Sequence, residues 1–141
     1  MDAVTRSLLE GDDQPPIIRL REAAIILPLR DTRGNPTETY RRKFVEALIL
    51  AFGGVTVTNA EGYWRSPSGQ VVAEPVKIYT VAAPATSKSA DTLQRLAAEA
   101  CIALAQEAIY LRYHDGEVVL LTHEHAKVVL LTHEHAKALT T

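Results

Sequence analysis

Four of the five histidines in this sequence lie in a perfect tandem repeat near the C-terminus. Residues 118–127 read VVLLTHEHAK, and residues 128–137 repeat all ten letters. In an extended chain, residues two apart project to the same face, so each His-x-His pair suits a pair of zinc ligands. The candidate zinc site consists of His123, His125, His133 and His135. The alternative is a tandem duplication without a function, in which the second copy is redundant.

The cluster Tyr63-Trp64-Arg65 is the second set of residues that can carry chemistry. Aromatic rings stack on nucleotide bases, and an Arg guanidinium binds negative charge. Arg19 and Arg21 project to one side of an expected strand and can add to such an anionic-ligand site. The alternative is that Trp64 packs under a helix while the charged side chains are solvated.

The sequence lacks the common signatures of several protein classes. It has no glycine-rich phosphate loop and no Gly-x-Ser-x-Gly motif. The single cysteine, Cys101, lies in an Ala/Leu-rich helical pattern, which is typical of a buried apolar side chain. A net charge of −2 gives no general attraction for nucleic acid, and no apolar run approaches the roughly 20 residues that span a membrane. We therefore expect no catalytic residue, no membrane or nucleic-acid partner, and a cytoplasmic location in a bacterium or an infected host cell.

A long β-hairpin from Gly53 to Ala82 is the expected centre of the fold. Val and Thr alternate at its start, Ser66-Pro67-Ser68-Gly69 has turn chemistry, and a Val-rich return strand follows. Because proline cannot donate to a sheet ladder, we expect an edge position or a bulge at Pro75. A second bulge is expected at Gly62.

Helices and further strands are expected on both sides of this hairpin. Residues 17–29 are predicted to form a strand, and residues 36–52 a helix capped by Asn35. A second helix is predicted to start after Asp91. Two strands, 109–113 and 117–122, are then joined by the Asp115-Gly116 turn, which is a strong hairpin signal.

The resulting order is β-α-β-β-α-β-β. It predicts an α+β, ferredoxin-like sandwich: a β-α-β-β-α-β unit with an antiparallel sheet, two helices on one face, and an extra C-terminal strand or hairpin. We divide the chain into a flexible arm (1–16), a single domain (17–122) and a tail (123–141) that contains the second repeat copy. The expected core includes Phe44, Leu48, Ile78, Leu96 and Leu104, with Trp64 partly buried.

The duplicated VVLLT segment offers two identical strands for one place in the sheet. We expect the first copy to form an ordered strand beside residues 109–113. The second copy is expected to add to a sheet edge, either in its own subunit or in a neighbouring one. The sequence therefore predicts a homo-oligomer, a dimer or larger.

Short motifs between residues 22 and 113 resemble those of a small bacterial family of unknown function. They are Gly54-Val55-Thr56, Gly62-Tyr63-Trp64, Gly69, Glu74 and Lys77, followed by Gln106-Glu107 after the second helix. The resemblance implies the same compact α+β domain and no established activity. Several relatives are lipoproteins, whereas this chain has no lipobox cysteine near its start.

These patterns favour a non-enzymatic binding protein that self-associates through sheet edges. Its ligand is expected to be a small anionic, nucleotide-like molecule or a partner protein, with no cofactor required. A phage or other mobile element is a fitting source for it. Two alternatives stay open: a metal-dependent enzyme that uses the His-x-His pairs, and a purely structural oligomer. The fold alone does not choose among them.

Overall fold

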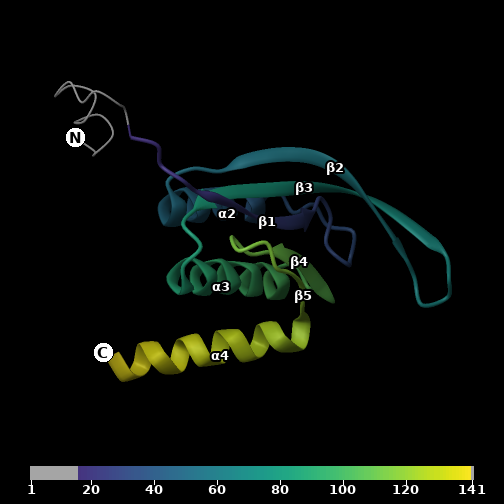
Figure 1. Cartoon of the computed structure of the whole chain (residues 1–141). Helices are drawn as coiled ribbons and strands as arrows, with labels where there is room; N and C mark the ends of the chain where they lie inside the picture. The colour runs from purple at the N-terminus through teal and green to yellow at the C-terminus, as the bar shows by residue number, and fades with distance from the viewer. Residues whose placement is uncertain (1–15, 141) are drawn as a thin grey trace.

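The structure is a computed structural model that describes residues 16–140, and the side chains of residues 16–134 (Figure 1). All but the last residue of the predicted arm lies outside this range. The elements, in chain order, are β1 (Arg21–Pro28), α2 (Glu38–Phe52), β2 (Thr56–Arg65), β3 (Val71–Ala83), α3 (Ser87–Ala103), β4 (Ala108–Arg112), β5 (Val118–Thr122) and α4 (His123–Thr140).

The five strands form one antiparallel sheet in the order β2-β3-β1-β4-β5. The first four of these positions follow the ferredoxin-like arrangement, and β5 extends the sheet beside β4. The predicted α+β class and the order of the first seven elements are therefore confirmed. No helix in the described part of the chain is long and apolar enough to cross a membrane.

The core lies between one face of the sheet and the helices α2 and α3. Ile25 and Tyr79, which pair across β1 and β3, both project to this face and are buried. The ring of Phe44 on α2 meets the ring of Tyr79 edge-on, with 5.1 Å between centroids. The predicted core residues Phe44, Leu48, Leu96 and Leu104 are buried. Ile78 is only half-buried, because it projects from β3 to the side opposite Tyr79.

The helix starts differ from the predicted caps. At α2 the flanking residue is Thr37 rather than Asn35, and its hydroxyl donates to the carbonyl of Pro28 at 2.7 Å. It thus ties the helix to the end of β1 instead of capping an amide. At α3 the cap is Thr86, whose hydroxyl accepts from the Ser89 amide at 3.1 Å. The helix therefore begins one turn before the predicted Asp91.

The central hairpin is confirmed, but neither predicted bulge forms. Pairing of β2 with β3 runs without interruption from Thr56↔Thr80 to Arg65↔Val71, through Gly62 and Pro75. Pro75 is tolerated in an inner strand because the pairing of β1 with β3 ends at Val76 and does not reach Pro75. The Pro75 carbonyl accepts a hydrogen bond from the Leu29 amide on the β1 side. The amide hydrogen that proline lacks would point to the same side, where the ladder has already ended.

The tail does not extend the sheet, so the prediction of a second repeat strand is wrong. Only VVLLT of the first copy is a strand, and the rest of both copies forms α4. Figure 1 shows α4 running alongside α3, and the two helices are in contact. The first copy already occupies the place beside β4. Ala126, Val129 and Leu130 then fall at helical spacing and pack against the core.

The pentapeptide VVLLT therefore occurs in two conformations, a strand at 118–122 and a helix at 128–132, and different leucines are buried in each. In β5 the side chain of Leu121 is 3% exposed, whereas its counterpart in α4, Leu131, is 70% exposed. Leu120 is exposed on β5, and its counterpart Leu130 is half-buried on α4. A strand buries alternate residues and a helix buries residues three and four apart, so the same letters place different side chains inside.

Candidate functional site

The outer end of the β2–β3 hairpin is a ribbon of two strands. Beyond the last β1 pair and the bond from Leu29 to Pro75, residues 62–65 and 71–74 pair only with each other. Figure 1 shows this end of the hairpin extending past the helices. Tyr63 and Trp64, both on this ribbon, are exposed. A ligand can therefore reach either face of it.

The ribbon divides the predicted cluster Tyr63-Trp64-Arg65 between two faces. Neighbouring residues in a strand project to opposite sides, so Tyr63 and Arg65 share one face and Trp64 lies on the other. Trp64 pairs with Val72 and is not among the side chains that pack on the core. The alternative in which Trp64 packs under a helix is therefore wrong. Whether either face binds a ligand stays a prediction.

Glu74 lies on the same face as Trp64, opposite Gly62. Trp64 and Glu74 occupy diagonal positions across the ribbon, which places their Cβ atoms within about 7 Å. Partial burial of the carboxyl raises the pKa of Glu74. Gly62 has no side chain of its own, and Cγ1 of Val76 lies 3.6 Å from the position that a Cβ would take there. The face therefore offers an aromatic ring and a carboxyl group beside the Val76 side chain.

The two arginines predicted to join this cluster lie elsewhere. Arg21 pairs with Ala83 at one end of β3, whereas Arg65 pairs with Val71 at the other end. A strand of 13 residues separates those ends by about 40 Å. Arg19 precedes β1 and is exposed. One site that joins all five predicted residues does not form within a single chain.

The histidines of the repeat lie on a helix, so the extended geometry behind the predicted zinc site is wrong. At 3.6 residues per turn, His123 and His125 project about 160° apart, and His133 follows about 15 Å further along the axis. The side chain of His135 lies outside the described residues. Among the side chains that are described, no three His, Cys, Asp or Glu residues lie close enough to hold a metal ion.

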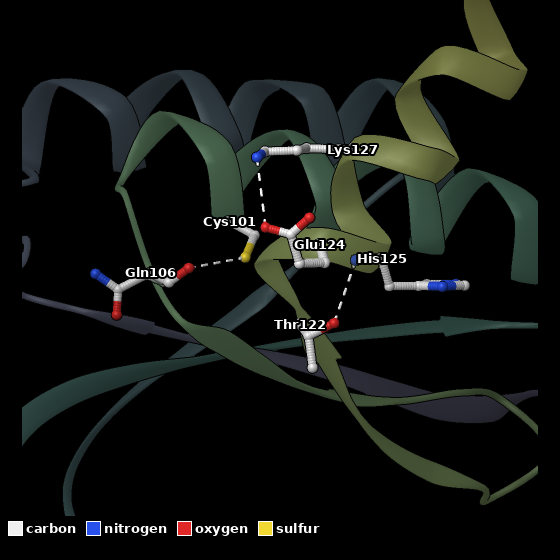
Figure 2. A network of polar contacts seen from close by, with 6 residues as sticks. All are labelled: Cys101, Gln106, Thr122, Glu124, His125 and Lys127. Carbon is white, nitrogen blue, oxygen red and sulfur yellow. Dashed lines mark hydrogen bonds and ion pairs between the residues drawn. The ribbon is translucent and has the colours of Figure 1, made fainter.

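The first turn of α4 instead serves to join the helix to the sheet (Figure 2). The hydroxyl of Thr122 accepts from the His125 amide at 3.2 Å, while the imidazole points away from Cys101 and Glu124. The Cys101 thiol donates to the carbonyl of Gln106 at 3.4 Å, and burial raises the pKa of this thiol. The prediction of a buried Cys101 is confirmed.

Sequence reasoning missed a groove at the start of α3. A cavity of about 230 Å³ is lined by residues 85–87 and 113–115 with Ala90. A second cavity of about 240 Å³ adjoins it and shares Ala90, Tyr113 and Asp115. The sequence showed His114-Asp115-Gly116 only as a turn. Nothing in its local pattern signalled that this turn would lie beside Thr86.

The fold and its open hairpin define a ferredoxin-like α+β domain with one additional strand and one additional helix. The chain belongs to the family described as protein of unknown function (DUF3574), whose model matches residues 27–120. This range contains the hairpin motifs that carried the resemblance seen in the sequence. Comparison with curated protein sequences finds no match.

Two solved structures of a phage protein have a similar fold. One is a phage SAM lyase in complex with S-methyl-5'-thioadenosine, with a TM-score of 0.61 at 17% identity. The other is phage SAM lyase in the apo state, with a TM-score of 0.55 at 15% identity. Each comparison covers 76% of this chain and 95% of the other. At this identity the likeness establishes the fold.

Proposed function

We propose that this protein binds a small adenosine-like ligand on the Trp64 face of the outer hairpin. The observation that carries the proposal is the exposed indole of Trp64 beside the half-buried carboxyl of Glu74. An indole stacks on a purine, and a carboxyl group hydrogen-bonds to ribose hydroxyls. The S-methyl-5'-thioadenosine bound by the phage SAM lyase belongs to this ligand class.

The opposite face of the ribbon supports a different ligand. Tyr63 and Arg65 share that face, and their chemistry suits an aromatic ring with a negative charge. This is the anionic, nucleotide-like ligand that the sequence favours. A phage or other mobile-element source, also expected from the sequence, agrees with the phage origin of the structural neighbour and forms part of the proposal.

Calorimetric titration with S-methyl-5'-thioadenosine and with AMP tests the two faces. Trp64→Ala should weaken binding of S-methyl-5'-thioadenosine by about 5-fold to 150-fold, because one stacked base contributes roughly 1–3 kcal/mol. Val71→Ala, an exposed residue on the opposite face, is the matched control and should leave the affinity unchanged.

Three results decide this test. Binding of S-methyl-5'-thioadenosine that survives Trp64→Ala rejects the Trp64 face. Binding of AMP that Arg65→Ala abolishes places the ligand on the Tyr63 face. Failure of the folded protein to bind either molecule rejects an adenosine-like ligand altogether.

A lyase activity is the second candidate function. When ionised, a carboxyl group whose pKa is raised by burial is a stronger base than an exposed one, and partial burial raises the pKa of Glu74 in this way. The structural neighbour is itself a SAM lyase. Chromatography of S-adenosylmethionine incubated with the protein checks this candidate. The lyase candidate predicts that S-methyl-5'-thioadenosine accumulates with the wild-type protein and does not accumulate with the Glu74→Gln variant.

Self-association through a sheet edge is also part of the proposal. The strand β5 is an edge of the sheet, and Val118 and Leu120 on it are exposed. Two backbone hydrogen bonds flank the β4–β5 ladder. The Tyr113 amide donates to the Glu117 carbonyl at one end, and the His123 amide donates to the Glu107 carbonyl at the other. By alternation along the ladder, the amide of Leu120 points away from β4 and is available to a second subunit.

Leu120→Pro should therefore convert an oligomer to a monomer while the fold is retained. Proline removes the outward amide that edge pairing needs, but it leaves the bonds to β4 intact. Leu120→Ala removes the side chain alone and serves as control. Sedimentation velocity measures the mass of both variants. A wild type that sediments as a monomer, or a Leu120→Pro variant that keeps the wild-type mass, contradicts pairing through β5.

A further inference from the structure

Residues 16–20, here called the leading segment, join β1 directly but do not pack on the sheet. All five residues are exposed, and the apolar side chains are 77% exposed at Ile17, 59% at Ile18 and 49% at Leu20. The segment makes no backbone hydrogen bond to another residue of the part of the chain that the structure describes. An extended, apolar segment of this kind is suited to pairing with the edge of a sheet.

The strand β2 offers such an edge, and its ten residues make it longer than the five-residue edge strand β5. At the hairpin end the Ser66 amide donates to the Gln70 carbonyl at 2.7 Å. By alternation along the uninterrupted ladder, the even-numbered residues of β2 direct their backbone groups to β3. The amides and carbonyls of the odd-numbered residues, among them Glu61 and Tyr63, point outward and can pair with an added strand.

One antiparallel register matches the leading segment to this edge. With Arg19 opposite Glu61, Ile17 lies opposite Tyr63. Opposite charges then meet in one pair, and a β-branched side chain meets an aromatic ring in the other. Arg19 and Glu61 belong to none of the ion pairs of the described side chains, which are Arg42–Glu38, Arg95–Glu99 and Lys127–Glu124.

The other face of the added strand fits the same register. Ile18 lies opposite Gly62, and Leu20 lies opposite Ala60, because neighbouring residues of a strand project to opposite faces. The small residues of β2 leave room for the two larger side chains of the segment. Both faces of the segment are therefore matched at once.

The segment cannot reach this place within its own chain. Arg21 pairs with Ala83 at one end of β3, and Glu61 pairs with Pro75, eight residues away along that strand. Eight residues of strand span about 26 Å, whereas Arg19 is two residues, or about 7 Å, from Arg21. The segment also leaves β1 in the direction away from Pro75. The edge of β2 can therefore receive the segment only from another molecule.

We propose that the leading segment of one copy adds to the β2 edge of a second copy as an antiparallel strand, with Arg19 opposite Glu61. The β5 edge matches the segment less well. Its outward-directed residues are Val118, Leu120 and Thr122, which carry no charge for Arg19 to pair with. This contact is separate from pairing through β5, and it does not depend on the ligand proposed for the hairpin.

Reversal of the two charges tests the pairing by sedimentation velocity of the full chain over a series of concentrations. Arg19→Glu and Glu61→Arg should each raise the dissociation constant of the assembly by roughly 2-fold to 30-fold, because a like-charge pair replaces an opposite-charge pair. The double variant restores opposite charges and should return to the wild-type value. Lys43→Glu makes the same change of charge at an exposed site on α2 and should have no effect.

Three results of this experiment overturn the proposal. They are a wild type that remains a monomer at every concentration, single variants that associate as the wild type does, and a double variant that associates no better than the single ones. Circular dichroism of each variant confirms that the fold is retained, since the substituted side chains are exposed.

Cysteine cross-linking identifies the edge. A mixture of Leu20→Cys and Ala60→Cys proteins should form a disulfide-linked pair on oxidation, because such non-hydrogen-bonded partners have Cα atoms about 4.5 Å apart. A mixture of Leu20→Cys and Leu120→Cys is the matched control and should cross-link much more slowly. The native Cys101 is buried and does not compete. Equal or faster cross-linking to position 120 contradicts docking on β2.

Discussion

Leu121→Ala should lower the free energy of unfolding by about 2–5 kcal/mol, whereas Leu131→Ala should change it by less than about 0.5 kcal/mol. The two leucines hold the same place in two identical ten-residue copies. Leu121 is 3% exposed on β5 and packs in the core, while Leu131 is 70% exposed on α4. Removing the isopropyl end of a buried leucine leaves a cavity, and removing that of an exposed leucine does not. Urea denaturation of both variants measures the difference.

Each variant is the control for the other, because the local sequence around the two substitutions is the same. Any effect of the substitution on the unfolded chain is nearly equal in both, so the difference between them reports the folded state. Equal costs would contradict the strand-then-helix arrangement of the repeat. A larger cost for Leu131→Ala would mean that the second copy, rather than the first, occupies the place beside β4.

Leu48→Ala should also cost about 2–5 kcal/mol, while Leu50→Ala should cost almost nothing. Both residues lie on α2 and have the same helix propensity. Leu48 is 1% exposed and packs in the core with Phe44, whereas Leu50 is 90% exposed. Because the substitution and the helix are the same, the difference isolates burial against the sheet.

Thermal or urea unfolding of both variants and the wild type under the same conditions measures the two changes in the free energy of unfolding. A cost near zero for Leu48→Ala would remove α2 from the core. A substantial cost for Leu50→Ala would show that the outer face of α2 is covered in solution, which would point to a contact between subunits.

The sequence was sufficient to predict the first seven elements, because each has its own local signal. Alternating Val and Thr mark β2, Gly53 ends α2 with a left-handed φ of 85°, and Asp115-Gly116 closes the last hairpin. The core face of α2 followed from helical spacing. Each of these signals depends only on residues that are close together in the sequence, so it can be recognised without knowledge of the tertiary structure.

The helix α4 and the groove could not be predicted in the same way. VVLLT is compatible with a strand and with a helix, and its conformation depends on whether the place beside β4 is already filled. The groove joins Thr86 and His114, which are distant in sequence and meet only through the order of the strands. Likewise, the separation of Arg21 from Arg65 follows from the register of β3 with its two neighbours.

The repeat also makes the order of events during folding important. Until α4 forms, β4 can pair with residues 118–122 or with residues 128–132, because the two segments are identical. The second choice lengthens the connecting loop about threefold, from 113–117 to 113–127, which costs roughly 1 kcal/mol of closure entropy. The nearer copy therefore reaches β4 first. Once the second copy folds into α4, it can no longer pair with β4 as a strand. Formation of the helix therefore prevents a pairing in which β4 is matched with the segment ten residues too far along the chain.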